Sequence, residues 1–284
     1  MRKTYSILLF FLCCSFIMAQ NQKVLVAAHR GDWRNYADNS IEGIESCIRM
    51  GVDIVEIDVA KTKDGHLVLM HDKTVDRTTN SKGKVSDFML EEICQIRLRN
   101  GLGRVTDFLI PTLEEVMLIS KDRIMVNIDK GDAYFDDIYK ILKKTGTVKQ
   151  AIIKSSKSYE ELKTQYGEIM DKMIFMQIIT LKKETTFDSI TPLLDKKYPY
   201  YEICFREDNY KLLSQIKKKL QEANSVIWMN SLWDSLNGGY SDDKALKDPD
   251  GTWGYLINEL GAGVLQTDRP MLMLNYLKEK KLHN

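Results

Sequence analysis

Two carboxylates lie two residues apart within an otherwise apolar stretch of the chain. Glu56 and Asp58 alternate with Ile and Val over 54–59, and residues i and i+2 of a β-strand point to the same face. Two buried carboxylates on one face repel each other and are costly to desolvate unless a cation lies between them. Oxygen ligands of this kind suit Mg²⁺ or Ca²⁺. The spacing therefore favours a divalent metal site over a buried ion pair with lysine or arginine.

Two of the four histidines follow apolar runs, at points where strands would end. His29 precedes Arg30 and Gly31 after the first run, and His71 follows the third. Histidine suits proton transfer near neutral pH because its unperturbed pKa is about 6.5. Arginine offers a planar donor fork that matches a phosphate group, and glycine permits close approach of a ligand to the backbone. These residues are candidates for acid–base chemistry and for phosphate binding.

A predicted hairpin connects the carboxylates to the second histidine. Asp64-Gly65 lies between two apolar runs, which is a strong hairpin signal because both residues tolerate positive φ. If these two residues form the loop, Asp58 lies opposite His71. The register therefore predicts an imidazole beside the proposed metal ligands.

Strand-like apolar runs alternate with helical patterns from residue 23 to the C-terminus. The nine runs cover 24–28, 54–59, 67–70, 124–128, 151–153, 173–179, 200–205, 226–229 and 262–265. The helical patterns cover 40–50, 133–144, 159–166, 209–222 and 255–260. Repeated strand–helix alternation argues for a parallel α/β architecture.

The hairpin accounts for the ninth run. The run 67–70 follows 54–59 too closely for a parallel crossover, so it is expected to return antiparallel to it. The other eight runs fit a (β/α)8 TIM barrel, with a doubly wound open sheet as the rival. The C-terminal strand ends of such a barrel form the active-site mouth. No repeat or linker divides the chain, so we expect residues 20–284 to form one domain.

The first 19 residues have the pattern of a secretory signal peptide. Arg2 and Lys3 precede an apolar stretch, and Ala19 offers a small residue for cleavage. The stretch is shorter than the roughly 20 apolar residues that a spanning helix needs. We expect an exported protein, periplasmic or extracellular, with no membrane span after cleavage. A retained membrane anchor, or lipid attachment at Cys13 or Cys14, is the alternative.

Charge and cysteine usage narrow the possible partners. The chain has 41 basic and 40 acidic residues and no basic stripe, which argues against nucleic-acid binding. Three cysteines remain after cleavage, Cys47, Cys94 and Cys204, and an odd number cannot pair fully within one chain. Their apolar surroundings predict small buried hydrophobes.

The stretch 26–113 closely resembles the glycerophosphodiester phosphodiesterase family. The matching pieces are Ala28-His29-Arg30-Gly31, Asp38-Asn39-Ser40, Val55-Glu56-Ile57-Asp58-Val59, Asp64-Gly65, His71-Asp72, Asp76-Arg77-Thr78-Thr79, Gly83-Lys84-Val85 and Pro111-Thr112-Leu113. Near the C-terminus, residues 263–270 resemble the family's last barrel strand. The resemblance implies a (β/α)8 barrel with a small insertion after the hairpin arm. That insertion would cover roughly 73–109, with 86–97 helical.

The resemblance also implies a reaction and roles for particular residues. The reaction is hydrolysis of a small-molecule glycerophosphodiester to sn-glycerol 3-phosphate and an alcohol, with one divalent metal ion, Mg²⁺ or Ca²⁺. His29 and His71 would be the acid–base pair, Arg30 would bind the phosphate, and Glu56 and Asp58 would hold the metal. In the family the nucleophile is thought to be the substrate's own 2-hydroxyl, which gives a cyclic phosphate.

The chain departs from the family's pattern at two places. The family commonly has Glu-x-Lys after its fourth strand, where this chain has Asp129 and Lys130, so Asp129 is expected to replace the glutamate as a metal ligand. The missing cation could be Lys154, which could instead be a surface residue at the barrel rim. Asn39 stands in a stretch where the family more often has Pro-Glu-Asn-Thr, and it is expected to keep a polar role toward substrate.

Five aromatic residues could line a substrate pocket: Trp33, Tyr36, Trp228, Trp233 and Trp253. Trp233, after the run 226–229, is expected near the mouth, whereas a packing role is expected for Trp253. A barrel enzyme of different chemistry, such as a sugar isomerase, is a further alternative, but it would lack the His-Arg-Gly stretch. Two other functions fit the same residues. One is a related phosphodiesterase that acts on intact phospholipid or sphingolipid. The other is an exported barrel that binds phosphodiesters without catalysis.

Overall fold

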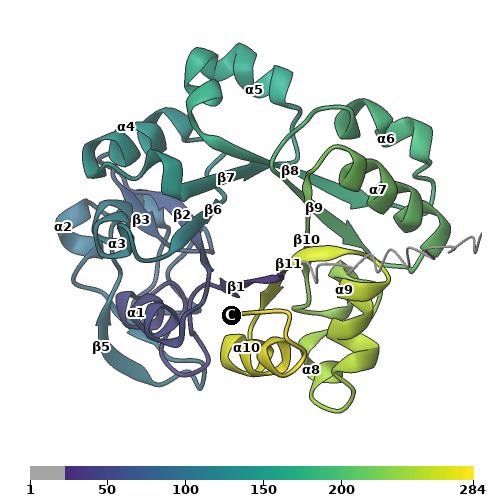
Figure 1. Ribbon diagram of the computed structural model, residues 1–284. Helices are drawn as coiled ribbons and strands as arrows, with labels where there is room; N and C mark the ends of the chain where they lie inside the picture. The colour runs from purple at the N-terminus through teal and green to yellow at the C-terminus, as the bar shows by residue number, and fades with distance from the viewer. Residues whose placement is uncertain (1–22) are drawn as a thin grey trace, which may run out of the picture.

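A closed ring of eight parallel strands forms the centre of the structure, a computed structural model that describes residues 23–284 (Figure 1). The strands are β1 (Leu25–His29), β2 (Ile54–Lys61), β6 (Met125–Asp129), β7 (Ala151–Ser155), β8 (Ile174–Leu181), β9 (Tyr200–Phe205), β10 (Val226–Asn230) and β11 (Ala262–Thr267). Each pairs with its neighbours in chain order, and β1 pairs with both β2 and β11. The TIM-barrel prediction is therefore confirmed, and the open-sheet rival is wrong.

Helices surround the ring on its outside (Figure 1). They are α1 (Ile41–Met50), α3 (Leu113–Ser120), α4 (Phe135–Thr145), α5 (Tyr159–Tyr166), α6 (Phe187–Leu194), α7 (Tyr210–Glu222), α8 (Asp242–Ala245), α9 (Tyr255–Asn258) and α10 (Pro270–Glu279). Local signals fix their ends: the Ser40 hydroxyl accepts from the Gly43 amide at the start of α1, and Gly51 ends that helix with φ 79°. The main apolar core lies between these helices and the strands.

Alternation along the strands divides the barrel interior into layers. Toward the strand starts the interior is apolar, with a cluster formed by Ala27, Ile54, Ile152, Met176, Trp228 and Val264. Two residues further along the same strands the inward-facing positions become polar, and include His29, Glu56 and Lys154. The apolar layer thus forms a floor beneath a polar layer at the C-terminal ends of the strands.

The hairpin arm is present, but its register differs from the prediction. β3 (Leu67–Leu69) pairs antiparallel with β2, with Val59 opposite Leu69. The Met70 amide donates to the Asp58 carbonyl at 3.0 Å, so the expectation that Asp58 lies opposite His71 is wrong. The loop has three residues, 63–65, because Thr62 and His66 still pair and only Gly65 takes a positive φ, 87°.

The insertion after the arm folds as a small hairpin with its own apolar cluster. It contains α2 (Leu90–Ile93) and the antiparallel strands β4 (Arg97–Arg99) and β5 (Val105–Leu109). The prediction of a helix over 86–97 is wrong, because helical turns cover only Val85–Asp87 and Leu90–Ile93 before Arg97 pairs with Leu109. The cluster packs Ile93, Leu98 and Ile110 against the barrel side.

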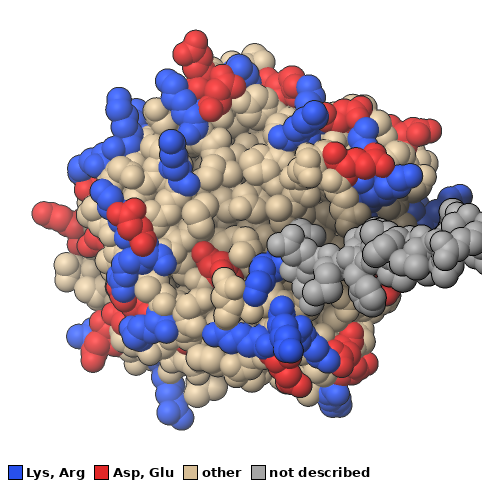
Figure 2. All heavy atoms as spheres, viewed as in Figure 1, with Lys and Arg blue, Asp and Glu red and all other residues tan. Residues whose placement is uncertain are grey.

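The two ends of the described chain meet beside β1, where the Val24 amide donates to the Leu282 carbonyl at 2.8 Å (Figure 1). On the face shown in Figure 2, basic and acidic side chains are interspersed. Among residues 23–284, no helix has the length and apolar character needed to cross a bilayer. The expected signal peptide and the candidate lipid-attachment cysteines lie outside the described residues. Cys47 and Cys204 are free and buried, and Cys94 is free and half-buried.

Candidate active site

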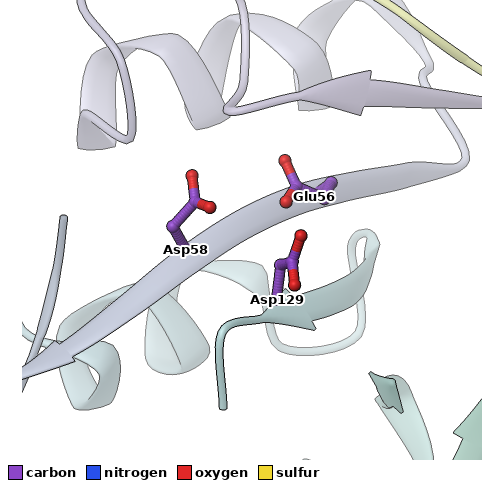
Figure 3. A group of neighbouring side chains, drawn as sticks. All are labelled: Glu56, Asp58 and Asp129. Carbon is purple, nitrogen blue, oxygen red and sulfur yellow. The ribbon is translucent and has the colours of Figure 1, made fainter. Parts of the chain in front are cut away.

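Three carboxylates converge at the C-terminal end of the barrel. Glu56 and Asp58 lie on the inward face of β2, and Asp129 projects toward them from the end of the neighbouring β6 (Figure 3). Each offers an oxygen that lies within 4.8 Å of the oxygens offered by the other two. Glu56 and Asp58 thus share one face of β2, as their spacing predicted, and Asp129 occupies the place expected for the family's glutamate.

The charges around this cluster leave a negative excess. Lys154 bridges Asp129 and a fourth acidic residue, Glu202. Without His29, four carboxylates are therefore balanced by only two cations, Lys154 and Arg30. Among the described residues, no lysine or arginine side chain pairs with Glu56. Burial, and then the charge of Asp58, raise the pKa of Glu56 well above its usual range. A divalent cation fits this donor set because it would offset the excess charge.

Lys154 lies inside the barrel and not at its rim. Its ammonium group is 3.1 Å from Asp129 and 3.1 Å from Glu202, and the residue is 3% exposed. Burial opposes the charged form, but Asp129, Glu202 and Glu56 hold the pKa of Lys154 well above its usual value. The rim alternative is therefore wrong, and a protonated lysine stands beside the carboxylate cluster. Lys130 is exposed.

His29 forms a buried pair with a residue from the far end of the chain. Its Nδ1 lies 2.7 Å from Asp268, which directly follows β11, and both side chains are buried. Burial alone would lower the pKa of His29, but the bond to Asp268 and the charge of Glu56 raise it above its ordinary value. With Nδ1–H donating to Asp268, Nε2 is the nitrogen free to exchange a proton with a ligand.

Asp268 is itself held by a second buried carboxylate. Asp242 accepts from the Asp268 backbone amide at 2.7 Å and from the indole of Trp253 at 3.0 Å. It also accepts from the hydroxyls of Ser231 and Thr267. Trp253 therefore has a packing role, as expected, and its indole helps to hold Asp242. Asp242 in turn fixes the backbone of Asp268, the partner of His29.

His71 forms a matching pair with its own neighbour. Its Nδ1 lies 2.6 Å from Asp72, and the Asp72 carboxylate also accepts from Arg77 at 2.7 Å. Arg77 reaches Asp38 at 3.4 Å, and Asp38 accepts from Arg30 at 3.0 Å. This chain of contacts connects the histidine of the arm to the arginine at the barrel mouth.

Arg30 presents an unsatisfied donor at the site. Its backbone takes a left-handed φ of 55°, and its amide donates to Glu56 at 3.0 Å. Nε is buried and lies 3.3 Å from Asp58, but it makes no hydrogen bond among the described residues. A buried guanidinium donor without an acceptor is suited to receive an anionic oxygen.

Asn39 is clamped to a carboxylate of the cluster. Its amide donates to Asp58 at 3.0 Å, and its carbonyl oxygen accepts from the Asp58 backbone at 3.0 Å. It also adopts a left-handed φ of 58°. The structure thus gives Asn39 a positioning contact, and the contact with substrate stays a prediction.

The aromatic residues divide into core and mouth. Trp228 is fully buried in the apolar floor, so its expected place along a substrate pocket is wrong. Trp233 is 46% exposed and packs edge-on against His29, with ring centroids 6.0 Å apart. The Trp33 indole donates to Asp268 at 2.7 Å. Trp233 therefore stands at the mouth as predicted.

Sequence reasoning missed Asp268, Asp242 and Glu202. Asp268 lay within the quoted C-terminal motif and directly follows the last strand, so barrel closure would have placed it beside His29. Glu202 is an acidic residue within the apolar strand β9, which is the same signal that identified Glu56. Nothing local singles out Asp242, whose partners come from three separate segments.

The arrangement combines two imidazoles oriented by carboxylates, the guanidinium of Arg30 as a donor for phosphate oxygens, a buried lysine and an acidic cluster. Such a site can bind an anionic phosphoryl group, stabilise charge that develops on its oxygens, and move protons on two sides.

Comparisons with known proteins agree with this reading. The model of the "glycerophosphoryl diester phosphodiesterase family" matches residues 29–225, and a domain of unknown function matches residues 175–277. A glycerophosphodiester phosphodiesterase from Caldanaerobacter subterraneus is 48% identical over 109 residues, 38% of this chain and 45% of that protein. Human glycerophosphodiester phosphodiesterase 1 is 28% identical over 188 residues, 64% of this chain and 52% of that protein. The chain thus spans about half the length of these curated relatives.

Solved structures show the same fold. A glycerophosphoryl diester phosphodiesterase from Parabacteroides distasonis superposes with a TM-score of 0.75 at 22% identity, over 92% of this chain and 88% of that one. An Oleispira antarctica phosphodiesterase, solved in complex with the product sn-glycerol-3-phosphate, gives a TM-score of 0.66 at 18% identity, over 90% of this chain and 97% of that one.

Proposed function

The chain belongs to the glycerophosphoryl diester phosphodiesterase family, and we propose that it hydrolyses glycerophosphodiesters to sn-glycerol 3-phosphate and an alcohol. The observation that carries the proposal is the meeting of His29, Arg30 and the carboxylates Glu56, Asp58 and Asp129 at one end of the barrel. The named relatives and the product complex of the Oleispira protein support it.

Glu56, Asp58 and Asp129 would hold one divalent cation, Mg²⁺ or Ca²⁺. A cation bound there would supply positive charge to the nonbridging oxygens of the phosphodiester. Arg30 binds the same phosphoryl group through its unsatisfied Nε, and the protonated Lys154 adds positive charge from the barrel interior. Asn39 keeps Asp58 in place through its amide, and it would contact the substrate from that position.

The two histidines act as general acid and general base. Asp268 and Asp72 bind their Nδ1 atoms, which leaves Nε2 of each imidazole for substrate. One imidazole accepts the proton of the nucleophile and the other donates a proton to the leaving alkoxide. The nucleophile is the 2-hydroxyl of the glycerol moiety, which gives a cyclic phosphate that water then opens. A 2-deoxyglycerol diester should therefore not be cleaved.

The protein acts outside the cytoplasm. The signal-peptide pattern of residues 1–19 supports this, and residues 20–284 form the mature domain. N-terminal sequencing of protein recovered from fractionated cells should find a start near residue 20. An intact N-terminus in the cytosolic fraction would contradict export.

The test of the reaction measures release of sn-glycerol 3-phosphate from glycerophosphocholine and its ethanolamine, inositol and glycerol analogues. Mature protein is assayed with EDTA, Mg²⁺ or Ca²⁺, beside His29→Ala and His71→Ala. We expect metal-dependent release that each substitution reduces by about 10²-fold or more. No release from folded protein under any condition would overturn the proposal, and would favour a phospholipid substrate or a barrel that only binds phosphodiesters.

A further inference from the structure

A cavity with a charged rim opens at the C-terminal end of the barrel, across the ring from the carboxylate cluster. It has a volume of about 890 Å³ and is lined by the ends of β8 and β9, the start of α7 and the loop after β10. This volume lies within the range of about 300–1,000 Å³ that is typical of small-molecule sites. The cavity is therefore large enough for a polar head group.

Two connections join this cavity to the site already described. Cys204 lines the cavity and lies 3.6 Å from Glu202, the carboxylate that holds Lys154. The loop after β10 carries Trp233 against His29 and then lines the cavity with Ser235 and Leu236. A diester whose phosphate lies at Arg30 could therefore extend toward this cavity.

The cavity carries an excess of unpaired positive charge. Lys182, Lys183 and Arg206 line it, and within residues 23–284 none of them forms an ion pair. Of its two acidic residues, Asp208 already accepts hydrogen bonds from the hydroxyls of Tyr240 and Tyr255, both at 2.8 Å.

The lining thus carries three cationic side chains against two carboxylates, Glu207 and Asp208, so its net charge is positive. Tyr210 is the single aromatic side chain among the described lining residues, so the cavity lacks the aromatic cage that a quaternary ammonium prefers. The lining thus suits an anionic group better than a choline-type cation.

We propose that this cavity receives the head group of the diester and selects head groups that carry a carboxylate or a second phosphate. The inference rests on the proposed function, because it assigns the cavity to the leaving alcohol of that reaction. Lys182 and Arg206 act as specificity-determining residues and contact the anionic substituent directly.

Glycerophosphoserine and glycerophosphoethanolamine form a matched pair of probes, because they differ by one carboxylate. We expect kcat/KM to favour the serine diester, and the double variant Lys182→Glu/Arg206→Glu to lower that ratio about tenfold. Slower turnover of the serine diester should account for most of that change. Raising the salt from about 0.05 M to about 0.5 M should also reduce the ratio, since exposed charges are screened.

Lys218→Glu, an exposed charge reversal further along α7, is the control and should leave the ratio unchanged. Binding of both probes to the His29→Ala protein, measured by calorimetry, separates the two proposals. Tighter binding of the serine diester that the double variant removes would support the cavity even if the wild type showed no turnover. Equal affinity for the two probes, or an equal effect of the control variant, would overturn it.

Discussion

His29 depends on a residue that lies 239 positions away in the chain. Asp268 orients the imidazole through Nδ1 and, with the charge of Glu56, outweighs the effect of burial on its pKa. His29 in turn lowers the pKa of Asp268 against the opposing effect of burial. The two charges thus balance each other at a buried position, where an unpaired imidazolium would be costly.

Substitution of Asp268 by Asn tests this pairing. The variant removes the charge that stabilises the imidazolium, so the pKa of His29 should fall, and the pH–rate limb that His29 controls should move to lower pH. We expect kcat to drop by about 10²–10⁴-fold, as when the orienting carboxylate of a catalytic histidine is lost. Steady-state kinetics across pH provide the measurement.

Asp243→Asn is the matched control, because Asp243 is exposed and pairs with Arg269 beside the same segment. It should leave kcat and the pH profile unchanged. An Asp268→Asn profile that superposes on the wild type would show that Asp268 does not set the pKa of His29.

At the scale of elements, the hairpin arm depends on the insertion that follows it. β3 has only three residues, and His71 lies beyond its last ladder pair. Arg77, from the insertion, connects Asp72 of the arm to Asp38 near the mouth. A short arm would leave His71 poorly oriented, and the insertion supplies the missing contacts.

Arg77→Ala should therefore impair catalysis more than stability. Arg77 is about half-exposed, so we expect a change of at most about 1 kcal/mol in the free energy of unfolding. The loss of orientation at His71 should lower kcat by about tenfold, with partial recovery in Arg77→Lys. Arg97→Ala, which removes an exposed pair with Asp107 in the same insertion, should leave kcat unchanged. Equal loss of kcat in both alanine variants would contradict a specific role for Arg77.

The elements also show where sequence reasoning reaches its limit. The nine apolar runs predicted the eight barrel strands and the arm, because continuous apolar runs and the turn pair Asp64-Gly65 are local signals. The register of the arm was wrong by one residue, since turn length depends on which residues take positive φ, and only Gly65 does. The hairpin of β4 and β5 was missed because its strands are short and contain few buried residues, so neither strand forms an apolar run.

The same limit applies to the site. Glu56, Asp58 and Asp129 could be predicted because each strand carries its own pattern. The partners that hold the histidines could not all be predicted, since Asp268 and Asp242 reach the site only through barrel closure and loop packing.

At the scale of the whole molecule, the barrel is closed around an uncompensated negative charge. β2 and β6 bring oxygens of three carboxylates within 4.8 Å of one another. Their mutual repulsion opposes folding unless a cation or a proton reduces it. Metal binding and the stability of the barrel are therefore linked, because only the folded chain assembles the three ligands.

Thermal unfolding should show this linkage. Mg²⁺ or Ca²⁺ at about 100 times its Kd should add about 2.7 kcal/mol, which for a chain of this size is roughly 5–10 °C in Tm. Glu56→Gln should abolish that response while leaving the Tm in EDTA equal to or above that of the wild type, because it removes a repelling charge from a buried site. Glu184→Gln, at an exposed position without an ion pair among the described residues, should keep the full response. A Glu56→Gln protein that is less stable in EDTA, or that still gains the full increase in Tm with metal, would mean that Glu56 is a structural partner and that the cation is held elsewhere.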